Sequence, residues 1–350
     1  MDAKKFLSQL IDIPGVSGYE EKVSKAIKEA FELYCDEVHC DAFYNVYGKK
    51  VGNSENSGPK IMLAAHLDEI GLMVKDIDDK GFISFTNIGG VDQRILLSQE
   101  VYVHGKKRLF GVIGAKPPHL QNRDQINKAV SMEEMVIDVG LSSEKVKELI
   151  SIGDFITFNS PLTQLKGGNV CGKSIDDRAG VVMLYETMKE LDKLVYSGEI
   201  YFVATAQEEV GTRGAIISTY KVNPDIGIAI DVTHGDTPDA SKDETHAMDK
   251  GPAIAMGPNM HPKLTQKLMD VAQENGIDHL VEVAPGLTGT DARSMQVSRE
   301  GVPTLLIELP LRYMHTTVET LNMDNVKKAA KLTALFIASL KEGWEECLTY

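Results

Sequence analysis

The sequence of 350 residues carries a net charge of −14 at pH 7, with Asp and Glu spread along it rather than gathered in a tail. This acidic balance excludes a basic nucleic-acid-binding surface, and at about 150 residues per domain the length predicts two domains. The chain holds no run of about 18 apolar residues and no CxxC pair among its four cysteines, so we expect no membrane partner, reduced thiols and a cytoplasmic location.

The N-terminal part predicts two helices followed by a buried strand. Residues 4–10 and 20–34 have helical spacing, and the segment 60–65 is an apolar strand that ends at His66. Asp68 stands two residues after His66, where its carboxylate can hydrogen-bond one ring nitrogen and fix the tautomer. A single His after an apolar strand is more often an ordinary core residue, so this motif needs support from the rest of the chain.

A β-rich segment begins near residue 76. Short strands, separated by turns that carry Gly, Asp and Lys, are predicted over residues 82–85, 100–104, 109–113, 136–139 and 155–158. This pattern is typical of a small β-barrel or sandwich. We therefore predict an inserted domain over residues 73–161, with the main domain formed by residues 1–72 and 162–350.

Strands and helices alternate in the remainder, which predicts an α/β layer structure around a parallel or mixed sheet. The expected helices cover residues 178–191, 262–275 and 324–344, and the expected strands cover residues 200–206, 226–230, 280–283 and 302–309. Open α/β sheets place their sites at strand ends, where the metal-ligand candidates of this chain fall.

Two adjacent carboxylates, Glu208 and Glu209, follow the strand 200–206. Adjacent side chains diverge at the end of a strand, so Glu209 can bind a metal while Glu208 faces the water to be activated. An isolated Glu-Glu pair is more often an exposed acidic turn. The assignment of Glu209 as a ligand and Glu208 as the general base gains weight because further ligand candidates surround the pair in the fold pattern.

Three other segments carry such candidates. The pair Asp176 and Asp177 precedes the helix 178–191 and can serve as its N-cap, as a bridging metal ligand, or as both. Asp231 follows an apolar strand, where its negative charge needs a compensating partner. His315 has few polar neighbours in the sequence. Together with the two segments above, these residues form a nitrogen and oxygen set suited to zinc, cobalt or manganese, with enough charge for two ions. The pattern indicates metal-assisted hydrolysis.

Five segments occur in the order and spacing of one known family, namely residues 66–71, 176–178, 207–215, 289–292 and 312–315. The chain resembles the dinuclear metallo-aminopeptidases of metallopeptidase family forty-two, which include glutamyl aminopeptidase and the tetrahedral (TET) aminopeptidases. Some members carry a cellulase or endoglucanase label. The resemblance covers nearly the whole chain and implies a three-layer αβα metallopeptidase domain with an inserted small β-barrel-like domain.

The resemblance also implies two divalent ions per subunit, zinc or cobalt, bound by five residues: His66, Asp176, Glu209, Asp231 and His315. Asp176 would bridge the ions, with His66 and Asp231 on one and Glu209 and His315 on the other. Asp68 would orient His66, and Glu208 would be the catalytic base. The substrate pocket would include Gly289, Thr290 and Asp291, and the peptide bond between Asp176 and Asp177 would be cis.

The implied activity is release of the N-terminal residue from peptides, which are the expected partners. By the same resemblance the inserted domain would drive homo-oligomerisation, with dimers assembling to a dodecamer. Three other functions compete: a metal-dependent amidase or deacylase of N-acyl substrates, an endoglucanase, and a non-enzymatic assembly protein. The endoglucanase is the weakest, because metal already claims the carboxylates and the chain has one Trp for sugar stacking. Glu208, which binds no metal in this assignment, favours catalysis over a purely structural role.

Overall fold

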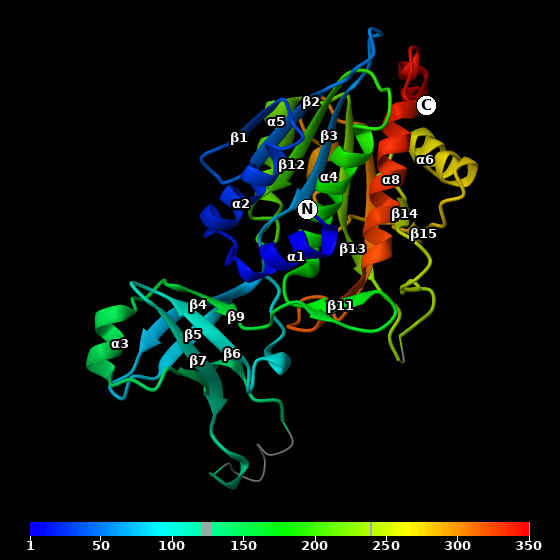
Figure 1. Ribbon diagram of the computed structural model, residues 1–350. Coiled ribbons are helices and arrows are strands. Elements are labelled where there is room, and N and C mark those ends of the chain that lie inside the picture. The colour runs from blue at the N-terminus through cyan, green and yellow to red at the C-terminus, as the bar shows by residue number, and fades with distance from the viewer. Residues whose placement is uncertain (121–127, 239, 350) are drawn as a thin grey trace.

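The computed structural model describes residues 1–120, 128–238 and 240–349. Figure 1 shows an α/β body, in which helices cover a large sheet, and a smaller β-barrel beside it. The predicted fold class, an α/β layer structure with an inserted β-barrel-like unit, is confirmed. Among the described residues, we find no helix with the length and apolar character needed to cross a membrane.

The body is built on a mixed sheet that has eleven strands among the described residues, in the order β1-β2-β12-β3-β13-β16-β17-β11-β10, with β14 and β15 branching from β16. Its centre is parallel, because β12 and β13 both pair in parallel with β3, and β16 pairs in parallel with β13. The central strands are β3 (Lys60–His66), β12 (Glu199–Thr205), β13 (Ile226–His234) and β16 (Thr304–Arg312). The flanking strands are β1 (Glu37–Cys40), β2 (Val46–Val51), β10 (Thr163–Gln164), β11 (Asn169–Gly172), β14 (Ala253–Met256), β15 (Leu280–Val283) and β17 (Glu319–Asn322).

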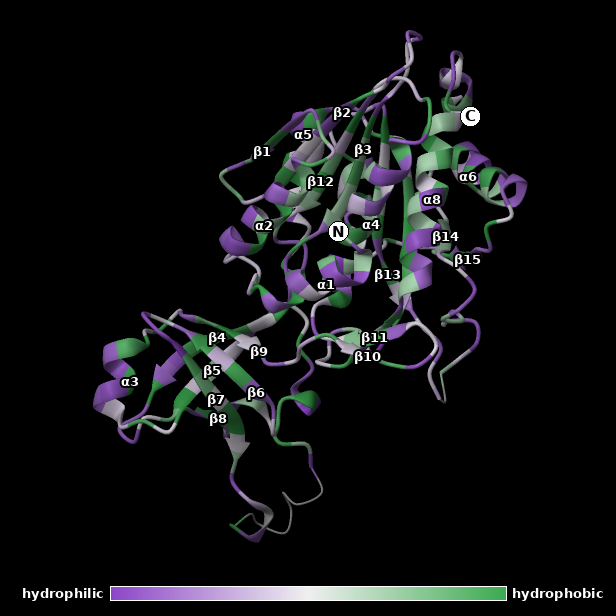
Figure 2. Cartoon of the chain, viewed as in Figure 1, coloured by the Kyte–Doolittle hydropathy of each residue, from purple (hydrophilic) through white to green (hydrophobic). Residues whose placement is uncertain are grey.

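Helices cover both faces of this sheet. One face carries α1 (Ala3–Asp12), α2 (Glu21–Phe31), α4 (Ile175–Leu191), α6 (Pro262–Glu274) and α8 (Met323–Ser339), and the other carries α5 (Arg213–Val222) and α7 (Ala292–Gln296). Successive residues of β3 alternate between the two hydrophobic cores that result, since Ile61 and Leu63 belong to one core and Met62 and Ala64 to the other. Figure 2 shows hydrophobic residues concentrated on the central strands.

The barrel closes in the order β4-β5-β8-β7-β6-β9 around its own hydrophobic core. Its strands are β4 (Gly71–Ile77), β5 (Ile83–Ile88), β6 (Glu100–His104), β7 (Arg108–Ala115), β8 (Met135–Asp138) and β9 (Phe155–Phe158). All five strands predicted in this segment are confirmed, whereas β4 and the short helix α3 (Ser143–Leu149) lie outside the predictions. The described residues also form short 3-10 helices, namely η1 (Gln93–Ile95), η2 (Pro118–Leu120), η3 (Met132–Glu134) and, near the C-terminus, η4 (Trp344–Leu348).

Several element boundaries differ from the sequence predictions, two of them by four residues or more. Helix α8 ends at Ser339 rather than at 344, because Leu340 leaves the helical conformation and Gly343 adopts a left-handed one (φ 83°). Strand β13 continues beyond 230 to His234, because its pairing with β16 extends that far. Asp231 therefore lies inside a strand, beside the neighbouring strand β16, and not in a loop after it.

A buried charge network joins the end of β3 to the start of α4. Glu69 is 2% exposed; its Oε2 accepts from Lys173 Nζ at 2.5 Å and its Oε1 accepts from Arg178 Nη2 at 3.1 Å. Burial alone would raise the pKa of Glu69, but the two cations hold it at about 2. Because Lys173 precedes Asp176 and Arg178 follows it, this network fixes the backbone on both sides of Asp176.

We expect Glu69→Gln to lower the free energy of unfolding by about 3 to 5 kcal/mol at pH 7, since it leaves two buried cations without their carboxylate. The folded-state pKa of about 2 lies below the ordinary value of 4.5, so the stabilisation is present above about pH 4.5 and is lost as the pH falls toward 2. Urea unfolding midpoints at neutral and acidic pH will measure both effects, and the difference from wild type should shrink on acidification.

Glu190→Gln is the matched control for this prediction. Glu190 also pairs with a cation, Lys193, at 2.7 Å, but the two side chains are 31% and 64% exposed. Its removal should change the free energy of unfolding by less than about 1 kcal/mol. Equal effects of the two substitutions would contradict the structural role of Glu69.

Candidate metal centre

The five predicted ligands meet at the carboxyl edge of the parallel strands. His66 is the last residue of β3, Glu209 follows β12, Asp231 lies in the second half of β13, and His315 follows β16. Parallel strands end at the same edge of a sheet, so these segments, far apart in the sequence, converge there. Asp176 arrives from the first turn of α4, which packs against β3.

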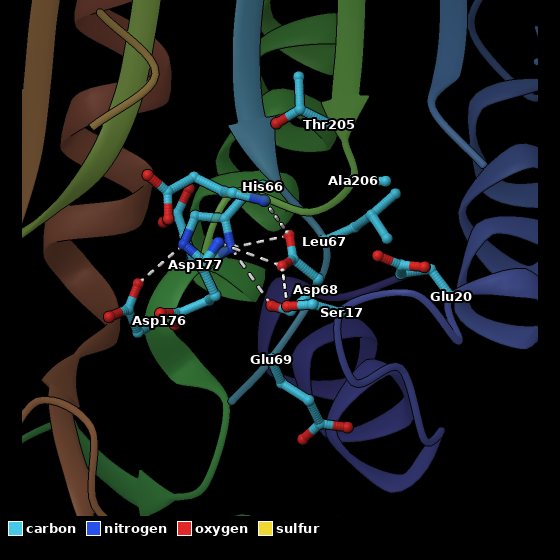
Figure 3. A network of polar contacts seen from close by, with 12 residues as sticks. Ser17, Glu20, His66, Leu67, Asp68, Glu69, Asp176, Asp177, Thr205 and Ala206 are labelled. Atoms are coloured by element: carbon cyan, nitrogen blue, oxygen red, sulfur yellow. Dashed lines mark hydrogen bonds and ion pairs between the residues drawn. The ribbon is translucent and has the colours of Figure 1, made fainter. Parts of the chain in front are cut away.

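Their donor atoms form two groups that share one residue. The first group is His66, Asp176 and Asp231, and the second is Asp176, Glu209 and His315; within each group the potential ligand atoms lie within 4.8 Å of one another. Asp176 belongs to both. Figure 3 shows His66 directed at Asp176, with 3.0 Å between Nε2 and Oδ1. On the other side, His315 Nε2 lies 3.4 Å from Asp176 Oδ2 and 3.5 Å from Glu209 Oε2.

Both imidazoles are oriented for metal binding by backbone carbonyls. His66 Nδ1 donates to the carbonyl oxygen of Asp68 at 3.2 Å, and His315 Nδ1 donates to that of Gly90 at 3.1 Å. In each ring Nε2 is thereby left to face the shared carboxylate, which is the arrangement of histidine ligands in metal sites. Gly90 belongs to the connection between β5 and β6, so the barrel segment reaches the site.

The electrostatics of the groups also suit a divalent cation. Burial, and then repulsion by Asp177, raises the pKa of Asp231 well above its usual range. Burial and repulsion by Asp176 raise the pKa of Glu209 to about 7. Buried carboxylates that repel one another are stabilised when they coordinate a metal, and two nitrogen with three carboxylate donors suit zinc, cobalt or manganese. The residues present therefore fit a divalent metal.

Asp68 makes further contacts besides the one predicted for it. Its carboxylate Oδ1 lies 3.6 Å from His66 Nδ1, whereas its own backbone carbonyl accepts from that ring. The carboxylate also accepts the backbone N–H groups of Glu208 at 3.0 Å and Glu209 at 3.3 Å, and the hydroxyl of Ser17 at 2.6 Å. Asp68 thus anchors the turn that carries Glu208 and Glu209, a long-range contact that the sequence does not reveal.

Glu208 lies beside both groups without belonging to either. Its side chain lines the same cavity as the five ligand candidates and is 9% exposed. Burial, with Asp231 and Asp291 nearby, raises the pKa of Glu208 to about 10, and His66 opposes this rise. A pKa of about 10 would keep Glu208 protonated at neutral pH, but divalent cations held by the neighbouring ligand groups would lower it and make the carboxylate available as a general base.

The segment around Asp176 has the geometry for both functions considered for it. Asp177 Oδ1 accepts the backbone N–H of Gly180 at 3.0 Å, as a helix-capping residue does, while Asp176 faces the ligand groups. The peptide bond between the two is cis, as the family resemblance implied.

Glu319 is a buried site residue that the sequence did not reveal. Its Oε2 accepts the backbone N–H groups of Ile175 at 2.7 Å and Asp176 at 3.1 Å, and its Oε1 accepts that of His315 at 3.1 Å. The carboxylate of Glu319 therefore holds both Asp176 and His315 in place. Glu319 follows His315 by four residues, and only its burial in a polar strand could have singled it out.

A cavity of about 540 Å³ opens onto the ligand groups. Gly289 and Thr290 line it, as predicted for substrate-binding residues. Asp291 is not among the lining residues: it is 2% exposed, and its Oδ2 accepts the hydroxyl of Thr205 at 2.6 Å. Asp291 is the N-cap residue of α7 and bonds to Thr205, the last residue of β12. It therefore supports the residues that line the cavity without lining it.

Comparisons with known proteins identify relatives along nearly the whole chain. Residues 45–332 match the model of the M42 glutamyl aminopeptidase family. A lysyl aminopeptidase of Pyrococcus furiosus is 36% identical over 343 residues, covering 96% of this chain and 97% of the relative. The structure of a TET aminopeptidase from Thaumarchaeota archaeon SCGC AB-539-E09 superposes with a TM-score of 0.93 at 32% identity, covering 99% of each chain. The TET1 peptidase of Pyrococcus horikoshii, which can assemble into a tetrahedron or a large octahedral shell, has a TM-score of 0.84 at 33% identity, covering 97% of this chain and 100% of that one.

Proposed function

This chain belongs to the M42 glutamyl aminopeptidase family and is an aminopeptidase, and we propose that it releases N-terminal residues from peptides by metal-dependent hydrolysis with Glu208 as the general base. One observation carries the proposal. Two ligand groups share Asp176 and open onto the same cavity as Glu208, a carboxyl group that belongs to neither group.

The proposed cofactor is a pair of divalent ions, zinc or cobalt, held as the ligand groups suggest. His66 and Asp231 would bind one ion, Glu209 and His315 the other, and Asp176 both. When bound, such ions lower the pKa of a water molecule and polarise the carbonyl of the scissile bond.

The side chains of the protein would perform the proton transfers. Glu208 would accept a proton from the attacking water and then donate it to the departing amine, so that one carboxyl group serves as base and acid in turn. Asp68 would keep the turn with Glu208 and Glu209 in position through its hydrogen bonds to their backbone N–H groups. The free α-amino group of the substrate would bind against the carboxylates of the centre, which accounts for cleavage at the first peptide bond.

A deacylase of N-acyl substrates is the competing function, since the same ligand set could activate water toward an acyl amide. Peptides that differ only in having a free or an acetylated N-terminus separate the two. With enzyme stripped of metal and then reloaded with zinc or cobalt, we expect cleavage of free N-termini only, and only after reloading. Cleavage confined to acetylated peptides would establish the deacylase instead, and cleavage without metal would rule out the proposed mechanism.

The compartment and assembly state belong to the same proposal. The four cysteines form no disulfide, which supports a reducing cytoplasm. We propose that residues 73–161 form a domain that mediates homo-oligomerisation, as TET relatives form large assemblies. Through Gly90, which contacts His315, the same segment supports the metal centre.

A further inference from the structure

Two glutamates besides Glu208 and Glu209 line the cavity onto which the ligand groups open. Glu308 lies in β16, directly paired with Asp231 of β13, and therefore stands next to a predicted metal ligand. Glu282 lies in β15, which reaches β16 through β14. Both side chains line the cavity, although neither belongs to the two ligand groups.

The carboxyl group of Glu308 has an unused oxygen in a buried position. Glu308 is 5% exposed, and its Oε2 has no hydrogen-bond partner among the residues that the structure describes. Glu282 Oε2 is likewise buried without a hydrogen bond, 3.4 Å from His246 Nε2. Buried oxygens without donors are unfavourable, so a ligand with N–H groups that reaches them would gain binding energy.

The charge balance of the cavity indicates the sign of that ligand. Within the described part of the chain, six carboxyl side chains line the cavity, whereas Arg293 is the one Arg or Lys that does. Four of the six are the three acidic ligand candidates and Glu208, which leaves Glu282 and Glu308 for the substrate. Although burial opposes it, His246, whose Nε2 lies 3.4 Å from Glu282 Oε2, lowers the pKa of Glu282 to about 2, so Glu282 is negatively charged at neutral pH.

We propose that Glu282 and Glu308 form the subsite for the side chain of the first substrate residue, and that the enzyme prefers peptides beginning with Lys or Arg. This inference rests on the aminopeptidase function proposed above. A Lys ammonium or Arg guanidinium donates to both orphaned oxygens and neutralises the buried charge. An aliphatic side chain leaves those oxygens unpaired, and an acidic one adds a third carboxyl group beside them.

Peptides identical except for their first residue test this preference in the metal-loaded enzyme. Charge-assisted hydrogen bonds to buried groups account for about 10- to 100-fold in kcat/KM, and we expect that margin for Lys and Arg over Leu. Peptides beginning with Glu test the opposite preference, because Arg293 lines the same cavity and could bind an acidic side chain. A preference for Leu or Glu in the wild-type enzyme overturns the inference.

Variants locate the preference. Glu282→Gln should lower the ratio of kcat/KM for Lys over Leu by about 10-fold or more, and Glu282→Lys should raise the ratio for Glu over Lys. Glu308→Gln tests the second carboxyl group independently, should either Glu282 variant fail to fold. Glu190→Gln, which removes an equal charge from the far end of α4, should leave the Lys to Leu ratio unchanged.

The results distinguish this inference from the function on which it rests. An unchanged Lys to Leu ratio in both Glu282→Gln and Glu308→Gln overturns the subsite while leaving the aminopeptidase in place. Failure of the metal-loaded enzyme to cleave any peptide with a free N-terminus overturns the proposed function, and this inference with it.

Discussion

Replacing Glu208 with Gln is expected to lower kcat for peptide hydrolysis by about 10²- to 10⁴-fold while the protein keeps its metal ions, since general acid–base catalysis contributes that factor. Gln has the shape of Glu but cannot accept a proton from water at neutral pH. The backbone N–H of residue 208 still donates to Asp68, so the turn keeps its position. Steady-state kinetics and metal analysis on the same preparation measure the two quantities.

Glu209, the residue next to Glu208, supplies a matched comparison for Glu208→Gln. Glu209→Gln changes the same chemical group one residue away, but Glu209 belongs to the second ligand group. We expect Glu209→Gln to lower the metal content, whereas Glu208→Gln lowers turnover alone. A Glu208→Gln enzyme with wild-type kcat would show that another group removes the proton, and loss of metal in that variant would make Glu208 a ligand.

Asp176→Asn is expected to have the largest effect on metal binding. Asp176 is the one residue shared by both ligand groups in the described part of the chain, so its replacement weakens both positions. Changes to residues that only support a ligand reduce metal affinity about 10- to 100-fold, and the loss of a shared ligand should exceed that range. After dialysis, metal per subunit measured by mass spectrometry should fall toward zero, with activity lost in parallel.

Asp231→Asn is the matched comparison for the bridging role of Asp176, because Asp231 belongs to the first ligand group alone. It should reduce the metal retained at one position and leave Glu209 and His315 able to hold the other. Asp192→Asn, at a surface ion pair with Lys50 where the Asp side chain is 46% exposed, should change neither. Retention of full metal content by Asp176→Asn would refute the bridging role.

The hydrogen bonds around the candidate ligands explain why substitution of one of them should leave the rest of the site in place. Glu69 fixes the residues on both sides of Asp176, and Glu319 accepts the N–H groups of Asp176 and His315. Asp176 and His315 are thus held through their backbone N–H groups, and these hydrogen bonds do not involve their side-chain donor atoms. A site held in this way keeps its geometry when one donor atom is exchanged, which makes metal content and turnover separable measurements.

The supporting contacts were beyond sequence reasoning for a specific reason. Asp68 lies beside the imidazole of His66, as its place in the sequence predicts, with 3.6 Å between Oδ1 and Nδ1. Its carboxylate also accepts the backbone N–H of Glu208, which is 140 residues away and could not be foreseen. Glu319 and Glu282 lie in short strands whose acidic residues resemble ordinary surface positions. Asp291 was expected in the pocket from the family motif, yet it lies beneath it.

The sequence by itself determined the α/β body and the β-rich insertion, because periodicity and apolar runs are local properties. It also indicated the candidate ligands, because five segments with His, Asp or Glu occur in the order and spacing of one family. The family resemblance already implied two ligand groups that share Asp176. The tertiary structure alone decided that Asp231 sits within its strand, that Glu319 holds the backbone of Asp176 and His315, and that Glu282 and Glu308 line the cavity. Those facts depend on which strands become neighbours and on the rotamers that buried charges adopt to find partners. Such long-range pairing leaves no pattern in the order of the residues.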